Sequence, residues 1–271
     1  MNFVQTLNNE IETYELLLQS IPFTDYPTTI NYLKIYKLNY KELHKYMSSN
    51  SFPIDNSKLL KLTISLGNLI KSLHLDEEMY RNQQKNGMAS KLNALAESPK
   101  HYINSVPINS QPLYQIKFIK NLLLILKNFD IGYHLKDQAS STTLNQYTSS
   151  PIKLNSKQLL IEKLEININL DTLFIYKHLL NLLVRIFDIL KIHLGFNDNY
   201  LINSNDRSSI FSSNSVNSGS SDSISVDEYF RVLNQILNRV TNGLVEPLLK
   251  FIMDFVGQSV SSEFGTLITS L

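Results

Sequence analysis

The chain has 271 residues, of which 43% are hydrophobic and 18% are charged, and these are the proportions of an ordinary globular protein with a sizeable core. Its 25 basic and 24 acidic residues leave a net charge of +1, so no overall field draws the molecule to nucleic acid, which is not an expected partner. Cysteine is absent, which excludes disulfides, thiolate catalysis and iron–sulfur clusters and fits a reducing compartment.

The first segment, residues 3–18, has apolar side chains at helical spacing and is predicted to form an amphipathic helix. It is acidic, and the first basic residue of the chain is Lys34. A signal peptide begins with a basic region and a transit peptide is rich in arginine, so neither is expected here. We therefore expect a protein that is not secreted and resides in the cytoplasm or the nucleus.

Three further helices are predicted before residue 133, separated by prolines, which end helices because they lack an N–H donor. The second covers residues 30–47. The third starts near Leu59 and extends through a more polar stretch to about residue 97. The fourth covers residues 112–132, with Gly132 placed as its C-terminal stop.

The most hydrophobic run, residues 170–194, is long enough to span a bilayer at about 1.5 Å of rise per residue. However, an arginine, lysine or aspartate at the centre of a membrane costs about 2.5–3.5 kcal/mol, and the run contains several. Its polar residues form one narrow stripe at helical spacing: Asp171, His178, Asn181, Arg185 and Asp188. The run is therefore predicted to be a core helix of a bundle that ends at Gly195, and not a transmembrane span.

Residues 164–170, just before that helix, alternate apolar and polar side chains as a half-buried strand does. No partner strand is evident in the sequence. A helical or irregular lead-in is therefore favoured over a small hairpin.

The last helical segment opens with a capping box, Ser225 followed by Glu228. Its apolar stripe runs from residue 230 to residue 256. Pro247 lies inside this stripe and removes one backbone hydrogen bond, so we expect a kink or a break between residues 242 and 247.

Two stretches, residues 137–156 and 197–224, are rich in serine, asparagine and threonine. Such segments bury too little apolar surface to offset the entropy of ordering them. Both are predicted to be flexible, disordered insertions in a single helical domain that covers residues 1–271.

Motifs for chemistry are scarce. The eight glycines are too far apart in the sequence to form a glycine-rich phosphate-binding loop or a nucleophile elbow. The six histidines show neither an HExxH motif nor another common metal-ligand spacing. No catalytic residue, metal or cofactor is predicted, although an active site could still be assembled from side chains that are distant in the sequence.

Two features are candidates for binding. Within the predicted helix over residues 30–47, four lysines recur every three or four residues and tyrosines lie between them: Lys34, Lys37, Lys41 and Lys45. On one helix face they could contact an anionic membrane surface. The alternative, which the neutral charge of the whole chain favours, is an ordinary solvated face.

The second feature is the C-terminal segment, where apolar side chains keep helical spacing up to the last residue: Val260, Phe264, Leu267, Ile268 and Leu271. A frayed tail is usually polar, so this segment is expected to dock on something. Its own bundle is the preferred site. The alternative is a groove on a partner, or a membrane surface.

Together these observations predict an all-α, elongated bundle of roughly six to eight helices. By elimination, the expected function is that of a non-enzymatic adaptor or structural subunit that binds other protein subunits in a cytosolic or nuclear complex. The first alternative is a peripheral membrane or lipid-binding protein of membrane trafficking that uses the lysine face. The second is an enzyme whose site is assembled only by the fold.

Overall fold

The structure is a computed structural model. It describes residues 3–25, 29–50, 52–97, 113–132, 153–154, 157–158, 171–204 and 226–270. The elements, in chain order, are α1 (Phe3–Ser20), β1 (Thr29–Tyr32), β2 (Tyr36–Asn39), α2 (Tyr40–Ser49), α3 (Asn56–Glu97), α4 (Leu113–Asn128), β3 (Lys153–Leu154), β4 (Lys157–Gln158), α5 (Thr172–Ser204), α6 (Val226–Val240), the π-helical segment η2 (Thr241–Val245) and α7 (Glu246–Ser270).

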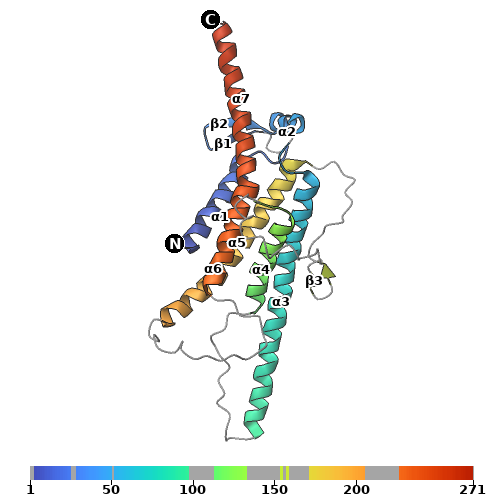
Figure 1. Cartoon of the computed structure of the whole chain (residues 1–271), viewed down its shortest axis with the longest axis vertical. Helices are drawn as coiled ribbons and strands as arrows, with labels where there is room; N and C mark the ends of the chain where they lie inside the picture. The colour runs from blue at the N-terminus through green and yellow to red at the C-terminus, as the bar shows by residue number, and fades with distance from the viewer. Residues whose placement is uncertain are drawn as a thin grey trace, which may run out of the picture.

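The helices form an elongated bundle, as predicted (Figure 1). α1 packs against α5, α3 packs against both α4 and α5, and α4 packs against α6. The lower part of α3 and the upper part of α7 project beyond the bundle at opposite ends of the molecule (Figure 1). The helices predicted in the first, third and fourth segments are confirmed as α1, α3 and α4.

Helix α5 forms the centre of the core. Leu179, Leu183 and Phe187 are fully buried, whereas the polar stripe that includes Asn181 and Arg185 is exposed. This confirms the prediction of an amphipathic core helix for the most hydrophobic run. Among the described residues, no helix combines the length and the apolar character that a membrane crossing requires.

The prediction that this helix ends at Gly195 is wrong, because α5 continues to Ser204. A glycine inside a helix costs only about 1 kcal/mol relative to alanine, which does not by itself end a helix. The first residues of the predicted insertion over 197–224 are therefore helical, and residues 205–224 lie outside the described residues.

The helix predicted over residues 30–47 is wrong in its first half, where β1 and β2 form an antiparallel hairpin. Ile30 pairs with Leu38 and Tyr32 pairs with Tyr36, so these four side chains lie on one face of the hairpin, through which Tyr32, Tyr36 and Leu38 pack on the core. The residues therefore follow the alternation of inward and outward side chains that is typical of strands, and not the helical spacing that the sequence also allows. α2 starts only at Tyr40, after Asn39, whose side chain accepts a hydrogen bond from the backbone of Lys41 at 2.9 Å.

The irregularity expected between residues 242 and 247 is present, as a change of helix form and not as a break. α6 and α7 are joined by η2, in which the helix widens to the π form over Thr241–Val245. Proline removes one donor from the helical ladder, and a local π turn is a common way to accommodate such a change. The buried Tyr176 hydroxyl of α5 donates to the Leu244 carbonyl in this segment at 3.2 Å.

Two other predicted segments fall mostly outside the described residues. The segment over 164–170 lies entirely outside them. Of the predicted insertion over 137–156, only Lys153 and Leu154 are described, and they pair as β3 with Gln158 and Lys157 of β4.

Candidate interaction surfaces

Helix α7 is anchored to the bundle by its first half. Ile252 and Phe255 are buried, and the ring of Tyr46 on α2 lies 5.2 Å from that of Phe255. The Tyr46 hydroxyl also accepts a hydrogen bond from the Gln258 side-chain nitrogen at 3.0 Å. These contacts fix the direction in which the second half of α7 leaves the molecule (Figure 1).

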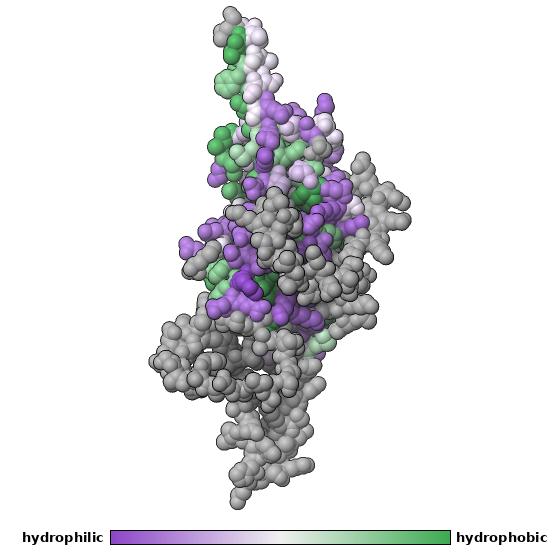
Figure 2. Space-filling model, in the orientation of Figure 1, coloured by the Kyte–Doolittle hydropathy of each residue, from purple (hydrophilic) through white to green (hydrophobic). Residues whose placement is uncertain are grey.

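The second half of α7 is exposed at every position from residue 261 to residue 270. Its apolar side chains gather on one side of the helix and form what we call the C-terminal stripe: Val260, Phe264, Leu267 and Ile268. Phe264 is 61% exposed, Leu267 59% and Ile268 72%. Figure 2 shows green, hydrophobic residues along this projecting part. Large apolar side chains exposed next to one another usually mark a contact site.

The other side of this helix is polar, with Ser262, Thr266 and Thr269 opposite the stripe at about 100° per residue. The Thr266 hydroxyl donates to the Glu263 carbonyl at 2.7 Å, and the Thr269 hydroxyl donates to the Gly265 carbonyl at 3.1 Å. These hydroxyls are satisfied within the helix itself. The helix is therefore amphipathic, with its apolar side uncovered.

Of the two docking sites considered for the C-terminal segment, the preferred one is wrong for the residues that the structure describes. The segment extends α7 away from the bundle and does not pack on it. The physical reason is geometric, because a continuous helix anchored by Phe251 and Phe255 cannot turn back toward the core. Leu271 lies outside the described residues.

The charge on this helix helps to choose between the remaining possibilities. From Phe251 to Ser270 the only charged residues are Asp254 and Glu263. A helix that lies on an anionic membrane usually carries lysine or arginine on its polar face. The C-terminal stripe therefore has no electrostatic support for binding such a surface.

The four candidate lysines do not share one helix face, so that expectation is wrong. Lys34 lies in the turn of the hairpin, Lys37 lies on β2, and Lys41 and Lys45 lie on α2. All four are exposed. Binding of these lysines to an anionic surface stays a prediction, but the lysines would now be presented by a hairpin and a short helix and not by one helix face.

The structure places two apolar residues beside these lysines that the sequence interpretation missed. Leu33 and Ile35 flank Lys34 in the hairpin turn, and Ile35 is 90% exposed. The alternation of Ile30, Tyr32 and Leu38 was the available signal for strands here, and it would have placed residues 33–35 in a turn.

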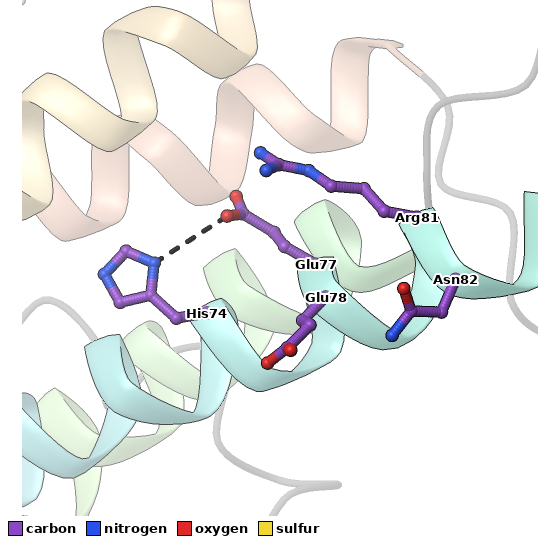
Figure 3. Close-up of a pocket in the computed structure, with 5 residues that line it drawn as sticks. All are labelled: His74, Glu77, Glu78, Arg81 and Asn82. Atoms are coloured by element: carbon purple, nitrogen blue, oxygen red, sulfur yellow. Dashed lines mark ion pairs between the residues drawn. The ribbon is translucent and has the colours of Figure 1, made fainter. Parts of the chain in front are cut away.

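A polar hollow of about 590 Å³ lies along α3 and is lined by His74, Glu77, Glu78, Arg81 and Asn82 (Figure 3). His74 Nδ1 lies 3.7 Å from Glu77 Oε2, which the dashed line marks. On its other side, His74 Nε2 lies 2.9 Å from an Arg185 nitrogen of α5. A guanidinium only donates, so His74 Nε2 is the acceptor in this contact. The Nε2 lone pair is thus engaged and is not free to act as a general base in this arrangement.

Within the described residues, no group of three histidine, aspartate or glutamate side chains could hold a metal ion. Comparisons of the chain with models of protein families, with curated proteins and with solved structures find no match.

Proposed function

We propose that this protein is a non-enzymatic helical adaptor, a structural subunit of a cytosolic or nuclear multiprotein complex, and that it binds a partner protein through the C-terminal stripe. The observation that carries the proposal is the exposure of Phe264, Leu267 and Ile268 on a helix that has left its own bundle.

The occupant that fits this surface is a protein with an apolar groove. Val260, Phe264 and Leu267 follow the i, i+4, i+7 spacing by which a helix inserts its apolar face into such a groove. The absence of cationic residues between Phe251 and Ser270 argues against an anionic membrane as the occupant.

The bundle supports this role because it presents the helix already formed. The contacts of Tyr46 with Phe251 and Phe255 fix the base of α7, so a partner does not have to order the whole segment. Full burial of a leucine, isoleucine or phenylalanine contributes about 1.5–3 kcal/mol. More than half of each such side chain in the stripe is still exposed, so each contributes about 1–2 kcal/mol on docking.

The experiment is purification of the tagged full chain from its own cells, followed by size exclusion. The wild-type chain is expected to retain a partner in stoichiometric amount. A variant with Phe264→Ser, Leu267→Ser and Ile268→Ser is expected to elute without it. The matched control carries Ser262→Ala, Thr266→Ala and Thr269→Ala on the opposite side of the same helix and is expected to keep the partner.

Two results would contradict the proposal. One is a wild-type chain that elutes alone. The other is a partner that the stripe variant retains as well as the control does, because the docking site would then lie elsewhere on the molecule.

A further inference from the structure

The turn of the β1–β2 hairpin holds two non-glycine residues in the left-handed region. Leu33 has φ 48° and Lys34 has φ 63°, and the turn is closed by the Ile35 amide, which donates to the Tyr32 carbonyl at 2.9 Å. A tight turn between antiparallel strands commonly requires positive φ at both of its central residues, and a leucine and a lysine adopt this conformation at an energetic cost. Here the strained turn carries Ile35 almost fully into solvent.

The segment that carries the turn is rich in lysine, and among the described residues the one carboxylate from elsewhere that is seen to bond to it, Asp171, contacts Tyr40 and His44 of α2. Residues 29–50 contain four lysines and one acidic residue, Glu42, so the segment has a net charge of +3 with histidine neutral, in a chain whose total is only +1. Lys37 pairs across the ladder with Asn31, on the side of the hairpin opposite the core face. Lys41 and Lys45, one helical turn apart, lie on the side of α2 away from the buried Leu43.

We propose that this hairpin surface, made of Leu33, Ile35 and the lysines at positions 34, 37, 41 and 45, binds the surface of an anionic lipid bilayer. The two aliphatic side chains enter the region of the headgroups, while the lysines contact lipid phosphates. A soluble anion would be attracted by the lysines but would gain nothing from Ile35. The combination of an exposed aliphatic turn with a local excess of cations therefore matches a bilayer.

This inference is independent of the proposed function and adds to it. The hairpin and α2 lie at the end of the bundle from which α7 projects (Figure 1). The stripe and the hairpin surface are separate sets of residues with different chemistry, one apolar and weakly acidic, the other apolar and basic. A molecule that uses both would hold a protein partner beside a membrane.

The test is co-sedimentation of the full chain with phosphatidylcholine vesicles that contain about 30% phosphatidylserine. The wild-type chain is expected to bind them, and to bind less as the salt concentration rises from about 0.1 M to about 0.5 M. A lysine near an anionic surface contributes about fivefold in affinity, so replacing all four lysines by glutamine is expected to lower binding by about 100-fold or more.

The matched control replaces four exposed lysines outside the hairpin surface by glutamine: Lys71, Lys120, Lys127 and Lys250. It changes the net charge by the same amount and is expected to bind nearly as the wild-type chain does. The C-terminal stripe variant is also expected to bind vesicles normally, so failure of one proposal is distinguishable from failure of the other.

Insertion of the turn into the bilayer can be measured separately by tryptophan fluorescence, because the chain contains no tryptophan of its own. Ile35→Trp supplies a single reporter, and its fluorescence is expected to shift to the blue on addition of anionic vesicles. The control reporter, Leu75→Trp on α3, is expected not to shift. A wild-type chain that does not bind the vesicles, a lysine variant that binds as well as the wild type, or an Ile35 reporter that stays in water would each overturn the proposal.

Discussion

Gly132 and Gly243 touch backbone to backbone. A Cβ atom on Gly243 would lie 2.2 Å from the backbone nitrogen of Gly132, which itself has a left-handed φ of +62° after the end of α4. Beside this contact, an Arg239 side-chain nitrogen donates to the Ile131 carbonyl at 2.8 Å. The turn after α4 is thus held against η2, the segment from which α7 receives its direction.

Gly243→Ala is expected to destabilise the protein by about 1–3 kcal/mol, because the neighbouring atoms are backbone and cannot move aside like the end of a flexible side chain. Chemical unfolding followed by circular dichroism measures this change in the free energy of unfolding. The control is Gly257→Ala on α7, where an added Cβ meets nothing within 4 Å. That control should be neutral or slightly stabilising, because alanine favours helix. Equal effects of the two substitutions would show that the close contact does not exist.

His193 is expected to make the protein sensitive to acid. Its ring is buried between Tyr114 and Phe118, Nδ1 has no hydrogen-bond partner among the described residues, and burial lowers the pKa to about 4. The unfolded chain, with the usual histidine pKa of about 6.5, binds the proton first. Stability is therefore lost as the pH falls from about 6.5 toward 4, by up to about 1.4 kcal/mol per pH unit.

The measurement is the free energy of unfolding at several pH values for the wild-type chain and for His193→Leu. The variant is expected to have a shallower dependence in this window. His178→Leu, at an exposed position of the same helix, is the control for the replacement of a histidine by leucine. A slope that is unchanged in His193→Leu would contradict the buried, neutral state of His193.

Lys34→Gly is expected to stabilise the protein by up to about 1 kcal/mol, because glycine adopts the left-handed φ of this position without the steric cost that a lysine has. Lys37→Gly removes the same side chain from strand β2, where glycine should lower stability by about 0.5–1 kcal/mol. Urea unfolding of the two variants compares them directly. If Lys34→Gly were as destabilising as Lys37→Gly, the turn would not have this backbone conformation.

The variant with serine at positions 264, 267 and 268 is expected to have the same free energy of unfolding as the wild-type chain, within about 0.5 kcal/mol, when both are unfolded by denaturant. Those side chains contact solvent and not the bundle, so their loss leaves the core intact. A loss of several kcal/mol would instead mean that the stripe packs on its own chain, as the sequence interpretation preferred.

The sequence allows the bundle to be predicted because long amphipathic segments have few competing interpretations. In α5, the spacing of Asn181 and Arg185 predicts which side faces solvent, and Pro247 predicts where the last helix changes its form. Both signals are local and strong. Both features can therefore be predicted without any knowledge of the tertiary contacts.

The hairpin could not be predicted in the same way. Ile30, Leu33, Tyr40 and Leu43 fit a helical period, while the turn lacks the glycine or asparagine that normally marks a tight hairpin. The path of α7 also depends on long-range contacts, such as that between Tyr46 and Gln258, which no local pattern reveals. The sequence therefore identifies the residues of the C-terminal stripe but not whether the bundle covers them.

Site-specific photo-crosslinking in the cells that make the protein tests the central claim most directly. A photo-reactive phenylalanine analogue is placed at Leu267, within the C-terminal stripe, and in a second chain at Ser262, on the opposite side of the same helix. We predict one strong crosslinked product from position 267 and little from position 262. Equal products from both positions, or none from position 267, would contradict docking through the stripe.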